Sequence, residues 1–118
     1  MTINNDILAF PTVEDWIAPT LQNGWVNFGN SDPSAGTFDS AGYCKDSIGF
    51  VFLKGLLRAG TGTTIFILPV GYRPSLRKIF ISYGSSTGQI RIDILPTGVV
   101  LAGQINITLS LEGIIFKP

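Results

Sequence analysis

The fold is decided by residues 43–74, which read YCKDSIGFVFLKGLLRAGTGTTIFILPVGYRP. Two strands are expected here, at Ser47–Leu57 and Thr63–Leu68, because both runs are strongly apolar and are bounded by turn residues. The segment Ala59–Gly62 lies between them and predicts the turn of a hairpin. Successive side chains of a strand point to opposite faces, and both faces of this predicted hairpin are apolar.

The doubly apolar hairpin needs a cover on its second face, because an antiparallel sheet in a small protein normally has only one apolar face. Leaving Phe50, Phe52 and Leu56 exposed would forgo about 4–9 kcal/mol, which is comparable with the stability of a whole domain. No window of the sequence has the periodicity of a helix that could serve as the cover. We therefore expect an obligate homo-oligomer whose interface contains Phe50, Phe52, Leu56 and Phe66.

The composition supports a chain that is partly covered by another chain. Its 118 residues are enough for one domain with its own core, and only 14% of them are charged, against about 25% in an ordinary soluble domain. The formal net charge is zero and the eight Lys and Arg residues are scattered. This pattern argues against binding to nucleic acid or to an anionic membrane.

Several kinds of chemistry lack their usual residues. The chain has no histidine, which removes the usual zinc ligand and the usual general base of a hydrolase. Cys44 is the single cysteine, so an intrachain disulfide is excluded and a buried, inert thiol is expected. No metal and no cofactor are expected. There is no signal peptide and no apolar run of roughly 20 residues, so we expect neither classical secretion nor membrane insertion.

The rest of the chain predicts further short strands. Asn23-Gly24 is a turn signal, and residues 29–42 are expected to form a surface loop. Residues 1–15 show no periodicity and are expected to be either a docking arm or a frayed terminus. Further strands are expected at Lys78–Tyr83, Gln89–Leu95, Gly98–Ala102 and Ile105–Phe116. The prediction is an all-β domain at residues 16–118, an antiparallel β-sandwich of jelly-roll type.

The late strands alternate between apolar and polar residues, as expected when one face meets water. Isoleucines at positions 90, 92 and 94 alternate with Gln89, Arg91 and Asp93. The alternation that begins at Ile105 slips after Glu112-Gly113, which predicts a β-bulge that resets the facing.

Four stretches of the sequence resemble a family of C-terminal domains from bacteriophage tail fibres, baseplate proteins and related minor structural proteins. They are residues 16–25 (WIAPTLQNGW), 45–56 (KDSIGFVFLKGL), 62–74 (GTTIFILPVGYRP) and 111–116 (LEGIIF). The most specific part is Gly71-Tyr72-Arg73-Pro74. Together the four stretches extend over nearly the whole chain from residue 16.

The resemblance implies a trimeric β-sandwich head on a virion, made in the host cytoplasm, that serves host attachment or structural cohesion. Domains of this family usually end a long protein, whereas this chain starts with Met and holds little besides the domain. The alternative is therefore a small capsid decoration or head-fibre protein that residues 1–15 fasten to other virion proteins.

A saccharide site is the most plausible binding site, because sugars stack on aromatic rings and their hydroxyls form hydrogen bonds with planar polar side chains. A purely structural role stays open for three of the candidate residues: Trp25 as a core residue, and Tyr72 and Arg73 as a structural corner. Asp39 and Asp46 could approach each other through the predicted loop as a glycosidase pair would, but solvated or turn-capping acids are the more common case, so an enzyme is not expected. The candidate ligand-binding residues are Trp25, Asp39, Tyr43, Asp46, Tyr72 and Arg73.

Overall fold

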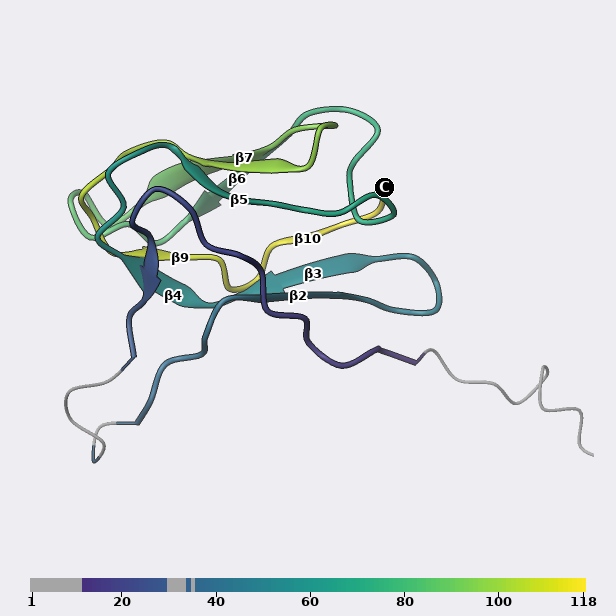
Figure 1. Ribbon diagram of the computed structural model, residues 1–118, viewed down its shortest axis with the longest axis horizontal. Helices are drawn as coiled ribbons and strands as arrows, with labels where there is room; N and C mark the ends of the chain where they lie inside the picture. Colours follow the sequence, from purple (N-terminus) through teal and green to yellow (C-terminus); the bar gives the residue numbers. More distant parts are fainter. Residues whose placement is uncertain (1–11, 30–33, 35) are drawn as a thin grey trace, which may run out of the picture.

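The computed structural model describes residues 12–29, 34 and 36–118, and every named element in them is a β-strand (Figure 1). All strand pairs are antiparallel, which confirms the all-β, antiparallel prediction. Within the described stretches, no helix is long and apolar enough to cross a bilayer. The strands are β1 (Val26–Asn27), β2 (Gly42–Lys45), β3 (Val51–Lys54), β4 (Leu56–Arg58), β5 (Thr64–Ile67), β6 (Lys78–Ser82), β7 (Ile90–Ile94), β8 (Val99–Ala102), β9 (Leu109–Ser110) and β10 (Ile115–Phe116).

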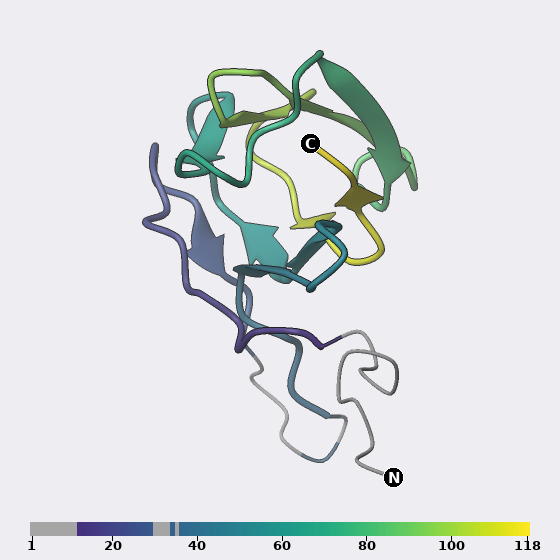
Figure 2. The ribbon, with the colours of Figure 1, turned by 90° about the vertical axis from the view of Figure 1, so that its right-hand side faces the viewer.

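The strands form two layers around one core, an arrangement compatible with a β-sandwich. One layer is a four-stranded sheet with the order β5-β8-β7-β6. The other layer contains two three-stranded sheets, β10-β3-β2 and β1-β4-β9. Figure 1 shows the two layers one above the other, and Figure 2 shows them from the end, enclosing the interior.

The apolar run at residues 47–57 forms two strands in place of the predicted one. Gly55 separates β3 from β4 and has a φ of 121°, which favours glycine. A Cβ added to Gly55 would lie 2.6 Å from the Cα atom of Ala41, so a larger residue does not fit there either. The chain therefore bends at Gly55, and β3 and β4 belong to different sheets.

The predicted hairpin between residues 47–57 and 63–68 is wrong. β4 pairs with β1 and β9, whereas β5 pairs with β8 in the opposite layer. The turn between them exists, but it carries the chain from one layer to the other. Gly60 is buried in this turn, where an added Cβ would overlap the Trp25 indole ring, and the Trp25 Nε1–H donates to the Gly62 carbonyl at 2.8 Å.

A register shift in β5 changes which side chains reach the core. The shift lies between Thr64 and Phe66, and it leaves both Ile65 and Phe66 fully buried although the sequence predicts opposite faces for them. Phe66 therefore offers no surface to a second copy of the chain, and its predicted place in an oligomer interface is wrong.

The late strands follow the prediction more closely. β6, β7 and β8 form where they were expected, whereas the predicted strand at residues 105–116 is reduced to β9 and β10, and a turn at Glu112-Gly113 separates them in place of the predicted bulge. Gly113 has a φ of 80°, and beyond it Ile114 is buried and Ile115 is exposed. The Leu111 N–H donates to the Gly55 carbonyl at 2.8 Å. The chain therefore passes from one three-stranded sheet to the other at two adjacent places, once between β3 and β4 and once between β9 and β10.

The N-terminal segment of the described chain runs along β2. Ile17 forms a bridge with Tyr43, and Val13 forms one with Asp46. The Asn23-Gly24 turn is confirmed by φ values of 53° and 75°. Residues 1–11 of the predicted docking arm lie outside the described residues, as do residues 30–33 and 35 of the predicted surface loop.

Candidate functional site

The six predicted ligand-binding residues do not come together. Trp25 is 2% exposed and belongs to the core, which was the alternative to its predicted role in ligand binding. Tyr43 is also buried, and its ring packs against the rings of Phe66 and Tyr72 at centroid distances of 6.3 and 5.1 Å. Neither Trp25 nor Tyr43 presents a free ring face to a ligand.

Asp46 stabilises a turn. Its Oδ1 atom accepts hydrogen bonds from the N–H groups of Ile48, Gly49 and Phe50 at 2.9–3.0 Å. Asp39 precedes β2 and Asp46 follows it, so the two carboxylates lie at opposite ends of this strand. They cannot act as a pair on one glycosidic bond.

Tyr72 and Arg73 take part in structural contacts. The Tyr72 hydroxyl donates to Glu14 Oε1 at 2.6 Å, and this hydrogen bond, followed by burial, raises the pKa of Tyr72 to about 12. The Lys45 Nζ atom lies 4.7 Å from the centroid of the Tyr72 ring. Arg73 Nε donates to the backbone carbonyl of Leu68 at 2.8 Å, so Arg73 bonds to the main chain.

Asp39, the remaining predicted residue, lines a cavity of about 510 Å³ that we call the aromatic pocket. Its walls carry three aromatic residues, Phe28, Phe38 and Tyr83. The Phe28 and Phe38 rings meet edge to face, with centroids 5.4 Å apart and an angle of 89° between their planes. Phe38 is 50% exposed and Tyr83 is 49% exposed, so both rings have surface to offer a ligand.

The floor of the aromatic pocket is the outer face of the β1-β4-β9 sheet. Leu56 of β4 pairs with Ser110 of β9, and both line the pocket, whereas their neighbours Leu57 and Leu109 are fully buried on the inner face. The short strands of this sheet alternate between core and pocket, as the period of two in a β-strand requires.

Hydroxyl groups surround this floor. The Ser85 Oγ accepts the Thr108 N–H at 2.9 Å, and the Ser110 Oγ accepts the Glu112 N–H at 3.0 Å. Each serine thus has its oxygen fixed by the backbone and still carries an O–H that can donate to a ligand oxygen.

Two carboxyl groups, those of Asp39 and Glu112, complete the lining of the pocket. Burial, followed by a hydrogen bond with Asp39, raises the pKa of Glu112. The Gly55 N–H donates to Glu112 Oε1 at 3.3 Å, and Lys54 Nζ lies 3.4 Å from Asp39 Oδ1. The aromatic pocket therefore combines exposed rings, hydroxyls and carboxyl groups, which is a set of groups that binds polyols.

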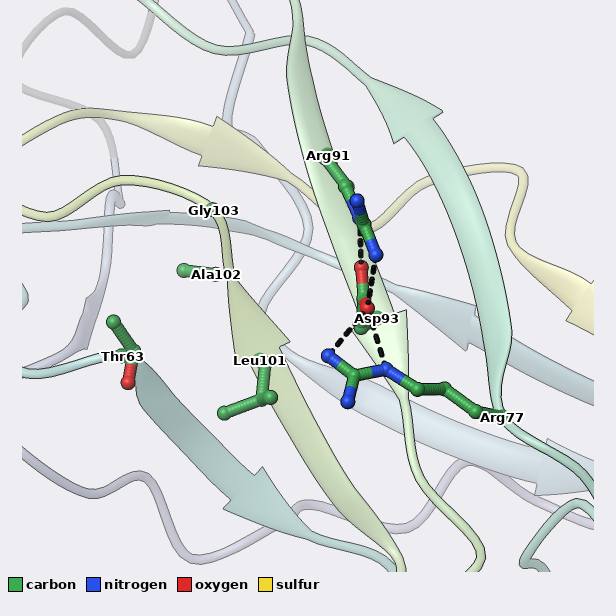
Figure 3. A pocket seen from close by; sticks show the side chains of 7 residues that line it. All are labelled: Thr63, Arg77, Arg91, Asp93, Leu101, Ala102 and Gly103. Atoms are coloured by element: carbon green, nitrogen blue, oxygen red, sulfur yellow. Dashed lines mark hydrogen bonds and ion pairs between the residues drawn. The ribbon is translucent and has the colours of Figure 1, made fainter.

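A second cavity of about 390 Å³, which we call the arginine pocket, lies on the outer face of the four-stranded sheet (Figure 3). Arg77 and Arg91 both point at Asp93, and their nitrogen atoms lie 2.7–2.9 Å from its oxygens. Asp93 is only 4% exposed, which corrects the prediction that this position of β7 faces water: the two guanidinium groups cover it. Because the donors that face Asp93 are already engaged, we regard the aromatic pocket as the candidate binding site.

The described residues contain no group of three or more side chains of the kinds that hold a metal ion. Cys44 is fully buried, and burial, with smaller effects of Glu14 and Asp46, raises the pKa of its thiol. A thiol of this kind is a poor nucleophile.

Phe28 and Phe38 are the main residues of the aromatic pocket that the sequence did not reveal as site residues. Phe38 is the one aromatic residue in the polar stretch at residues 29–42. An aromatic residue in an exposed loop was the available signal, since nothing local explains it.

The fold has a counterpart among solved structures. The chain is similar to the receptor binding protein (gp15) of Listeria phage PSA, with a TM-score of 0.67 and 23% sequence identity over 89% of this chain. This chain spans 64% of the length of that protein. No protein-family profile matches the sequence, and no curated protein matches it.

Proposed function

We propose that this chain is a non-enzymatic bacteriophage virion protein that acts in host attachment and binds a cell-surface saccharide in the aromatic pocket. The carrying observation is the pocket itself, whose half-exposed Phe38 and Tyr83 rings stand beside serine hydroxyls and two carboxyl groups. The fold shared with a phage receptor binding protein supports the place on the particle. Jelly-roll connectivity and a homotrimeric state are parts of the same proposal.

The partners of the pocket acids support binding without turnover. In glycosidases the two catalytic carboxyl groups flank the scissile bond and are separated by about 5 Å or more. Both pocket acids already have partners, because Glu112 Oε1 accepts the Gly55 N–H at 3.3 Å and Asp39 Oδ1 lies 3.4 Å from Lys54 Nζ, and such partnered carboxylates are typical of binding and structural acids. We expect no release of reducing ends from any polysaccharide that the protein binds, and release that Asp39→Asn abolishes would contradict this part of the proposal.

A glycan array probed with labelled protein tests the binding role. Phe38→Ser and Tyr83→Ser are expected to lose at least about tenfold in affinity for the glycans that the unmodified protein retains, because each removes a stacking surface. Val70→Ser is the matched control, since Val70 is 82% exposed and does not line the pocket. An equal loss in all three variants, or retention in the two pocket variants, would refute the assignment of the site.

Exposed apolar residues on both layers support the proposed oligomer. Phe50 is 38% exposed and Ile115 is 47% exposed on one layer, while Ile79 and Ile81 are 55% and 65% exposed on the other. Sedimentation of the chain at micromolar concentration tests this part, and a stable single chain would contradict it. Leu56, predicted at the interface, lines the aromatic pocket.

A further inference from the structure

The charged residues that line the aromatic pocket are acidic. Among the described residues, its charged lining consists of Asp39 and Glu112, with neither lysine nor arginine. Lys54 is the neighbouring cation, at 3.4 Å from Asp39, and its Nζ atom also lies 5.1 Å from the centroid of the Trp16 ring. One lysine stands against two carboxyl groups, so the pocket favours a positively charged ligand group over an anionic one.

The aromatic walls favour the same sign. The face of an aromatic ring attracts a cation, and this attraction is strengthened where the cation also leaves water. Phe28 and Phe38 meet edge to face, and Tyr83 lines the same cavity. Rings and carboxyl groups together form the kind of surroundings in which proteins hold ammonium groups.

We infer that the ligand of the aromatic pocket is a saccharide that carries a free primary amine, with its ammonium group between the aromatic rings and the carboxyl groups of Asp39 and Glu112. This inference rests on the proposed saccharide binding and names the class of sugar. The hydroxyls of Ser85 and Ser110 bind the oxygens of the same sugar.

The chemistry of the donors separates a primary amine from other ligands. A primary ammonium has three N–H donors, which match the acceptor oxygens of the two carboxyl groups, whereas a quaternary ammonium has none to offer them. An N-acetylated sugar brings no charge to offset the cost of desolvating the carboxyl groups. A sugar with a carboxylate or phosphate would meet like charge in the aromatic pocket.

Calorimetric titration with a matched pair of sugars tests this inference. The probes are a glucosamine tetrasaccharide with free amines and the same tetrasaccharide fully N-acetylated, measured at low salt and pH 6. We expect the free amine to bind about tenfold or more tightly than the N-acetylated form. Asp39→Asn and Glu112→Gln keep the shape of each side chain, and each is expected to reduce this ratio to about threefold or less.

Asp15→Asn is the control, because Asp15 is an exposed acid outside the pocket lining, and it is expected to leave the ratio unchanged. Equal or tighter binding of the N-acetylated form overturns the inference, as does a ratio that neither pocket variant changes. If neither tetrasaccharide binds, the inference is also overturned, while retention of other glycans that depends on Phe38 keeps the proposed function. If the unmodified protein retains no glycan on the array, both the inference and the proposed function are overturned.

Discussion

Replacing Asp93 by asparagine tests the interaction that closes the outer face of the four-stranded sheet. The carboxylate of Asp93 receives donors from two sides, Arg91 at 2.7 and 2.9 Å and Arg77 at 2.7 Å. Asparagine has almost the same shape but only one acceptor oxygen, so its NH₂ group must face guanidinium donors. The variant therefore removes the charge and creates a donor–donor conflict without leaving a cavity.

The expected loss of stability depends on how deeply Asp93 and its two arginine partners are buried. Removing one partner of a fully buried ion pair costs about 3–5 kcal/mol, and a hydrogen bond to a charged group contributes about 1.5–3 kcal/mol. Asp93 is nearly buried, but the side chains of Arg77 and Arg91 are 52% and 54% exposed, so water can solvate both cations in the variant. We therefore expect the lower end of these ranges, a loss of about 2 kcal/mol in the free energy of unfolding.

Urea unfolding of both proteins measures this loss, which corresponds to a fall of about 1 M in the midpoint. Hydrogen bonds from Arg91 hold the pKa of Asp93 below its ordinary value, although burial opposes them. The carboxylate therefore contributes stability above about pH 4, and this contribution is lost as the pH falls through the lowered pKa. The difference between the two proteins should thus shrink in acid. Equal midpoints at pH 7, or a difference that is constant down to about pH 2, would refute the reasoning.

Three further predictions concern the core and the N-terminal edge. Gly60→Ala places a Cβ against the Trp25 ring and should lower the melting temperature by about 5–10 °C; an unchanged melting temperature would show that the turn can move aside. Cys44 should resist iodoacetamide at pH 8 in the folded protein and react fully in urea, because burial raises the pKa of its thiol. Tyr72 should ionise near pH 12 in an absorbance titration, and Glu14→Gln should bring its pKa down towards 10, a shift that would be absent if their hydrogen bond were not formed.

The sequence predicts the class of the fold because hydrophobic alternation survives in the late strands. The isoleucines of β7 point inward and Arg91 points outward, as a period of two requires. The prediction from the sequence fails at residues 47–68, where the pairing of the strands depends on contacts between residues that are distant in the sequence. Nothing local distinguishes a hairpin turn at residues 59–62 from a turn that carries the chain to the opposite layer, and the bend at Gly55 depends on its closeness to Ala41.

The candidate site is less accessible to sequence reasoning. Trp25 and Tyr43 have the residue types of a sugar site but lie in the core, because burial is set by the whole fold and not by the local pattern. Asp39 was predicted, yet the second acid of the pocket, Glu112, lies 73 positions further along the chain, in the turn between β9 and β10. Sequence patterns predict such elements one at a time, whereas the pocket is assembled from five separate segments.

The paired crossover at Gly55 and Leu111 has a consequence for how this domain can diversify. Inserting or deleting one residue in either strand would put the two bends out of step, so the length of the pocket floor is fixed. The aromatic walls come from connecting segments, which tolerate changes in length and composition far better. We therefore expect related chains to differ most in the length and composition of the pocket walls and least in the length of the floor.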